Sequence, residues 1–186
     1  IIGNYQGFLP THNLGVQVGV KLPTGRSEDY VHFNHGPEAG SPLDASLQPG
    51  TGSTDLILGA YYYQALSQDF DGFANLQFQT AVNSHYDYRP GNQANFTIGL
   101  RYMSLDSWVP QVQFNMSHRS HDQGASADVE DTEGKFIYFS PGISHALTRN
   151  TQVYAFMQVP VYRDLDGWQL APGWTATVGF SYAFQH

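Results

Sequence analysis

Two histidine pairs are the residues of this sequence that could bind a metal ion. They are His32-x-x-His35 and His118-x-x-His121, and Asp122 directly follows the second pair. Imidazole suits zinc, copper or nickel, and two such pairs could converge at one place. An x-x spacing fixes no geometry in a loop, so solvated loop histidines are the simpler interpretation. We therefore assign no metal site and no cofactor, and keep His32, His35, His118 and His121 as candidates.

Nucleophilic catalysis is a second possible chemistry, because serine directly precedes histidine at 84–85, 117–118 and 144–145. Neighbouring residues of a strand point to opposite faces, so none of these pairs can form a nucleophile and its base. The absence of cysteine also excludes disulfide scaffolds, thiolate metal sites and cysteine nucleophiles. We predict that the protein is not an enzyme.

The elements that position these residues show a period of two. From 14 to 22, apolar residues stand at every even position, and glycine, glutamine or lysine stands at every odd one. Similar alternation recurs at 54–64, 72–84, 94–103, 108–117, 135–147, 151–163 and 173–184. Eight strands are therefore predicted, and Pro141 predicts a bulge or kink within its strand. The segment 1–9 could form a ninth strand.

The connections between these strands alternate in length. They span 23–53, 65–71, 85–93, 104–107, 118–134, 148–150 and 164–172. Outer-membrane barrels have short periplasmic turns and longer outer loops, with strands that alternate apolar-out and polar-in. The pattern predicts an all-β fold, a transmembrane antiparallel up-and-down β-barrel, as a single domain over 1–186 in the bacterial outer membrane.

The strand count bears on completeness, because such barrels have an even number of strands and both termini inside. Nine strands would begin on the outer side, so we expect an N-terminal portion to be missing and the barrel to have 10–12 strands. The alternative is an eight-stranded barrel in which 1–9 is an irregular arm.

The polar faces of the strands would line the interior of this barrel. They carry amide, hydroxyl and glycine residues and few charges, which suits uncharged solutes. The candidate pore-lining residues are Gln77, Gln79, Asn83, Asn95, Arg101, Gln111, Gln113 and Asn115. A packed interior whose polar groups bond only to one another is the alternative.

Aromatic residues near the strand ends fit the girdles of a membrane barrel. The predicted girdle consists of Trp108, Trp174, Tyr182 and Phe184. We also expect Tyr86 and Tyr88 near the outer rim. An aromatic-rich β protein of another kind would show the same composition.

The charge balance limits the partners. Eight Lys and Arg residues against sixteen Asp and Glu give a net charge of −8, and no basic run is present. This composition disfavours nucleic acid as a partner. The expected partners are outer-membrane lipid and lipopolysaccharide, a small-molecule solute, and a partner protein at the outer loops.

Four segments resemble a known family. They are VKLPTG at 20–25, LQPGTGSTDLILGAYYYQ at 47–64, YFSPGISHAL at 138–147 and WTATVGFSYAF at 174–184. Together they resemble the outer-membrane transporter-like barrels of the MetA-pathway of phenol degradation family. The resemblance implies a Gram-negative outer-membrane barrel linked to passage of hydrophobic or aromatic compounds, without catalytic residues. The loop HFNHGPEAGSP at 32–42 has no counterpart in it.

The function expected from these patterns is a channel or uptake pore for small uncharged or aromatic molecules. One alternative is a non-conducting structural or interaction barrel whose outer loops bind a partner protein or a metal. Another is a soluble lipocalin-like binding barrel, with apolar residues inside and polar residues outside.

Overall fold

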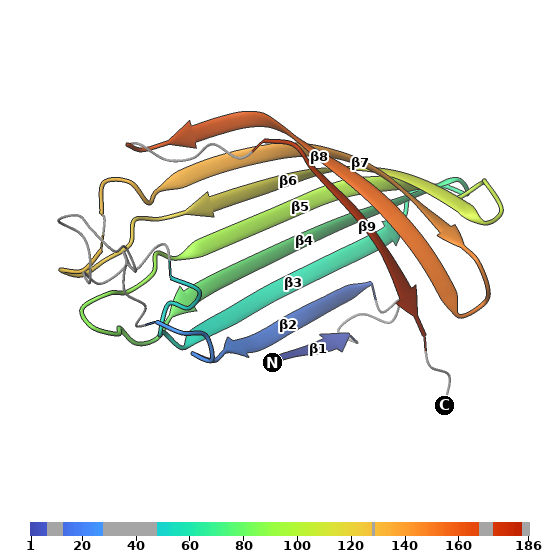
Figure 1. The fold of residues 1–186 in the computed structure, drawn as a ribbon. Helices are drawn as coiled ribbons and strands as arrows, with labels where there is room; N and C mark the ends of the chain where they lie inside the picture. The colour runs from blue at the N-terminus through green and yellow to red at the C-terminus, as the bar shows by residue number, and fades with distance from the viewer. Residues whose placement is uncertain (7–12, 28–47, 128, 168–172, 184–186) are drawn as a thin grey trace, which may run out of the picture.

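The computed structural model describes residues 1–6, 13–27, 48–127, 129–167 and 173–183. These residues form nine strands (Figure 1). The strands are β1 (Ile2–Gln6), β2 (Leu14–Lys21), β3 (Asp55–Ala65), β4 (Phe70–Ala81), β5 (Gln93–Tyr102), β6 (Trp108–Arg119), β7 (Gly134–Ala146), β8 (Thr151–Leu165) and β9 (Thr175–Tyr182). Within these ranges, no helix is long and apolar enough to cross a membrane.

The strands pair in sequence order in one antiparallel sheet, from β1 to β9. The eight predicted strands are all present, and β1 is the ninth that 1–9 could supply. Among the described residues no ladder joins β1 to β9, so both lie at the edges of the curved sheet (Figure 1). The prediction of an all-β, antiparallel up-and-down arrangement is confirmed.

The connections divide between the two ends of the sheet. Short turns at 66–69, 103–107 and 147–150 lie at one end. The longer connections 22–54, 82–92, 120–133 and 166–174 lie at the other. We call these the short-turn end and the long-loop end.

The two faces of the sheet differ in polarity. On the outer face, apolar side chains are exposed, as for Leu76 (51 %), Ile98 (46 %) and Met157 (44 %). The opposite, inner face carries the polar residues: Gln77 pairs with Gly59 on one side and with Asn95 on the other. A lipocalin-like barrel would have apolar residues inside, so this arrangement is the reverse of that alternative.

The pairing of β7 with β8 contains one irregularity. The register shifts between Ile137 and Tyr138, which marks a β-bulge. The pairs Phe139–Val159 and Gly142–Phe156 then keep one register across Pro141. The extra residue, Val161, lies on β8, so this is not the bulge or kink predicted at Pro141 on β7. The bulge interrupts the alternation of faces along β8. Ile137 faces Tyr162, whereas the next residue of β7, Tyr138, faces Pro160.

Candidate functional site

The inner face carries rows of amide and hydroxyl groups that hydrogen-bond across strands. The Oδ1 of Asn115 on β6 accepts from Thr97 Oγ1 and from Gln113 Nε2, each at 3.0 Å. Its Nδ2 donates to Ser140 Oγ on β7 at 2.7 Å. On the same face, nearer to β1, Gln77 Nε2 on β4 donates to Gln17 Oε1 on β2 at 3.2 Å. These bonds fix the orientation of the amides and satisfy part of their hydrogen-bonding capacity.

A buried carboxylate joins this inner face at the long-loop end. The side chain of Asp55 is 2 % exposed and forms an ion pair with Lys21 Nζ at 2.8 Å. Gln79 Nε2 and Ser53 Oγ each donate to it at 2.6 Å. The carboxylate is therefore neutralised and saturated with donors, as a buried charge must be.

Two cavities remain on the inner face, toward the short-turn end. One has a volume of about 590 Å³ and is lined by Tyr61, Tyr63, Phe73, Asn75, Arg101, Gln111 and Gln113, among others. The second, of about 280 Å³, is lined by Arg101, Gln111, Ser144, Gln152, Tyr154 and Phe156, among others. Arg101 and Gln111 line both cavities, so they lie between the two spaces. Both spaces are open hollows of the inner face.

Arg101 is the charged residue of this region. Its Nη2 lies 3.5 Å from Asp71 Oδ2, and its guanidinium carbon lies 5.6 Å from the centre of the Phe73 ring. Both contacts hold the side chain against the wall and offset its charge. Within the described structure, its Nε is buried without a hydrogen-bond partner.

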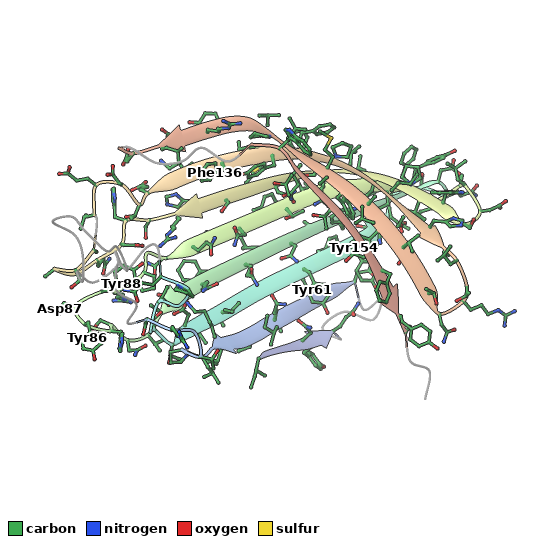
Figure 2. The ribbon with its side chains drawn as sticks, viewed as in Figure 1. Tyr61, Tyr86, Asp87, Tyr88, Phe136 and Tyr154 are labelled. Carbon is green, nitrogen blue, oxygen red and sulfur yellow. The ribbon has the colours of Figure 1, made fainter. Side chains whose placement is uncertain are left out.

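Four aromatic rings lie against glycines on the inner face. In each case the ring and the glycine are direct cross-strand partners, and a Cβ on the glycine would overlap the ring. The pairs are Tyr61 with Gly15, Phe73 with Gly99, Phe156 with Gly142, and Tyr154 with Gly179. Tyr61 and Tyr154 are labelled in Figure 2. The missing Cβ atoms let the rings lie close to the sheet.

The predicted pore-lining residues fall in two groups. Seven lie at inner-face positions of β4, β5 and β6, namely Gln77, Gln79, Asn95, Arg101, Gln111, Gln113 and Asn115. Asn83 lies beyond the end of β4, where its Oδ1 accepts from the backbone NH of Thr54 at 2.7 Å. It is exposed at the long-loop end. Whether these residues line a solute pathway stays a prediction.

The predicted girdle residues lie at the ends of strands. Trp108 begins β6, is 46 % exposed and stacks on His145 with ring centres 4.1 Å apart. Trp174 directly precedes the first residue of β9, and Tyr182 is its last residue. Both side chains are exposed. Phe184 lies outside the described residues.

Of the histidine candidates, the described residues include His118 and His121, which lie in different elements. His118 lies within β6, where it faces Lys135 on the outer side of the sheet. The expectation that His118-x-x-His121 falls in a loop is therefore wrong, because β6 continues to Arg119. His121 does lie in a long connection, with Nε2 2.9 Å from Glu133 Oε2. His32 and His35 lie outside the described residues.

One cluster that the spacing did not reveal joins two long connections. Asp122 is fully buried and accepts from Tyr88 OH at 2.7 Å, from Gly91 N at 2.7 Å and from Arg119 Nη2 at 2.8 and 2.9 Å. We call Tyr88, Asp122 and Arg119 the loop tie. Burial, followed by the hydrogen bond to Asp122, raises the pKa of the Tyr88 phenol. Tyr88 lies at the long-loop end (Figure 2) and is 4 % exposed, so its ring is covered by protein rather than exposed as in a girdle. That this end is the outer rim stays a prediction.

The loop tie follows an unusual turn. Residues 85 and 88 exchange backbone hydrogen bonds of 2.9 Å in both directions. The two central residues, Tyr86 and Asp87, have positive φ values of 48° and 55°. This is the conformation of a type I′ turn, which asparagine and glycine adopt at lower cost. Figure 2 shows the turn at the long-loop end.

The serine–histidine pair at 144–145 follows the rule of opposite faces. Ser144 lies on the inner side and accepts from Gln152 Nε2 at 2.9 Å. His145 stacks on the exposed Trp108. These two side chains thus form no nucleophile and base.

Comparison with known proteins gives a structural likeness without a sequence family. No protein family model matches the chain, and no curated protein matches its sequence. Among solved structures, the chain is similar to the COG4313 outer membrane channel from Pseudomonas putida F1, with a TM-score of 0.70 and 14 % identity. The likeness covers 97 % of this chain and 63 % of that one. It shows that the chain has the fold of an outer-membrane β-barrel and spans less than two thirds of this neighbour.

Proposed function

We propose that this chain forms part of the wall of an outer-membrane channel for small uncharged or aromatic molecules. The observation that carries the proposal is the polarity of the two faces. The outer face exposes apolar side chains, whereas the inner face carries hydrogen-bonded amides beside two cavities. A porin-type barrel needs this arrangement. The similar solved structure is itself an outer membrane channel.

The chemistry of the inner face supports the solute class. The larger cavity is bordered by phenol, phenyl and amide groups. The charge of Arg101 beside it is offset by Asp71, and at the long-loop end of the same face Lys21 pairs with Asp55. An uncharged solute can exchange its hydrogen bonds with water for bonds to the amides, and an aromatic ring can contact Tyr61 or Phe73.

The proposal includes the surroundings of the protein. The outer face would contact lipid, and lipopolysaccharide would contact it where the long loops face outward. The motifs at 20–25, 47–64, 138–147 and 174–184 together with the channel fold support a distant relationship to the MetA-pathway of phenol degradation family.

A conductance measurement with a matched pair of variants tests the proposal. Gln113→Trp places a large ring on the inner face, whereas Val112→Trp places the same ring on the outer face of the same strand. We expect the full-length protein to conduct in planar bilayers and to admit phenol into liposomes. Gln113→Trp should reduce both, and Val112→Trp should leave both unchanged. Folded protein without conductance or solute flux would overturn the channel and favour the non-conducting interaction barrel.

A further inference from the structure

Three metal-binding side chains meet at the long-loop end, away from the inner-face cavities. They are His121, Glu133 and Asp166, and their donor atoms all lie within 4.8 Å of one another. His121 lies two residues after β6, Glu133 directly precedes β7, and Asp166 directly follows β8. The group therefore connects the long connection 120–133 to the beginning of 166–174.

The distances suit one ion between the three donors. His121 Nε2 lies 2.9 Å from Glu133 Oε2 and 3.6 Å from Asp166 Oδ2. Ligand atoms about 2.0–2.2 Å from a tetrahedral Zn²⁺ ion are separated by about 3.3–3.6 Å. The separation of 2.9 Å is shorter than this range and that of 3.6 Å lies at its upper limit, so small side-chain movements would complete the geometry.

The imidazole is oriented for coordination. His121 Nδ1 lies 2.6 Å from the carbonyl oxygen of Val129. A carbonyl only accepts, so Nδ1 must carry the proton, and the lone pair of a neutral imidazole is then on Nε2. Metal-binding histidines characteristically have such a partner on their other nitrogen.

Hydrogen bonds also fix the three segments to one another. The backbone NH of Asp122 donates to Thr132 Oγ1 at 2.9 Å, which holds the neighbours of His121 and Glu133 together. The backbone NH of Asp166 donates to the carbonyl of Glu133 at 3.3 Å. Gly167 follows with φ of 67°, so the chain turns directly after the third donor. The donors are thus positioned before any ion binds.

We propose that His121, Glu133 and Asp166 bind one Zn²⁺ ion that holds the two long connections together. One nitrogen and two oxygen donors suit Zn²⁺, whereas Ca²⁺ and Mg²⁺ prefer oxygen ligands alone. The side chains of His121, Glu133 and Asp166 are 40 %, 24 % and 59 % exposed. An ion can therefore enter from solvent, and water can occupy the remaining position.

Equilibrium binding of Zn²⁺ to the folded, metal-free protein in detergent tests the site. A chromophoric chelator reports the free ion, and Ca²⁺ and Mg²⁺ are the comparison ions. We expect one Zn²⁺ per chain, and affinity reduced at least about tenfold by His121→Ala and by Glu133→Gln. His118→Ala and Glu130→Gln are matched controls that should leave affinity unchanged, because neither residue belongs to the group.

A second measurement keeps the test valid if His121→Ala disturbs the loops. Hydrogen exchange of 120–133 and 164–167 in the unmodified protein should slow when Zn²⁺ is added and return to its original rate with chelator. Absence of stoichiometric Zn²⁺ binding, or equal binding by His121→Ala, would overturn the proposal. The three side chains would then be a cluster that holds no ion.

Discussion

Removing the Asp122 carboxylate should release the two long connections that the loop tie joins. Asp122 accepts hydrogen bonds from a phenol, a backbone NH and a guanidinium, and its side chain is fully buried. Asp122→Ala eliminates these bonds and leaves the Arg119 cation without this partner. Breaking a buried ion pair by removing one member costs about 3–5 kcal/mol. Arg119 is 41 % exposed, so water can solvate it in part and the lower limit applies.

This free-energy difference converts directly into the population of the locally open state. A loss of about 3 kcal/mol increases the open population roughly 100-fold. Tyr88→Phe removes one hydrogen bond to a charged acceptor, which is worth about 1.5 kcal/mol or roughly tenfold. The two variants should therefore differ by about a factor of ten.

Hydrogen–deuterium exchange of the folded protein in lipid measures this opening. Peptides covering 85–92 and 119–124 should exchange faster in both variants, and in the predicted order. The centre of β4, at 74–79, serves as the internal reference, and Glu130→Gln is the control substitution because its side chain is exposed. Unchanged exchange at 85–92 in a folded Asp122→Ala protein would refute the reasoning, because the tie would then carry no measurable stability.

Three other predictions concern Tyr88, the turn at 86–87 and the outer face of the sheet. Because the pKa of Tyr88 is raised in the fold, the opened loop loses the phenol proton first as pH rises above about 10. Above that pH, exchange at 85–92 should accelerate more in the unmodified protein than in Tyr88→Phe. An equal acceleration in both proteins would contradict this prediction. Replacing Tyr86 and Asp87 by Asn and Gly should stabilise the turn by about 1 kcal/mol, seen as slower exchange there, since both residues have positive φ. Leu76→Arg should lower the free energy of unfolding in lipid vesicles by about 2–4 kcal/mol, measured by urea unfolding. Gln77→Arg on the inner face should lower it much less. Equal losses in the two variants would argue against a lipid-facing outer side.

Most of the fold can be predicted from the sequence, because the alternation of apolar and polar residues is a property of each short segment. Alternation at 14–22 assigns each residue to a face, and the pairing of Val18 with Leu58 and of Gln17 with Gly59 keeps those faces across strands. Connection lengths then determine strand order, because short turns join neighbours. Strand ends were less predictable: β6 continues through His118, whose polarity resembles that of the loop that follows.

The loop tie and the metal group could not be predicted from spacing. Tyr88 and Asp122 are separated by 34 positions, and Glu133 and Asp166 belong to different connections. Such contacts depend on how adjacent loops pack, which no period or motif encodes. In the sequence, Asp122 stands out only as the neighbour of His121, whereas in the structure its buried carboxylate contacts both loops.

The glycine–aromatic pairs of the inner face bear on the width of the proposed channel, whereas the amides bear on its chemical preference. Gly15, Gly99, Gly142 and Gly179 contribute no functional group, yet each determines how far a ring projects from the wall. A single methyl group at one of them would force its ring to shift, and a shift away from the wall would narrow the proposed channel. The hydrogen-bonding amides of β4 to β6 would remain in place. The size limit for solutes and the chemical preference among them can therefore change independently, through different residues.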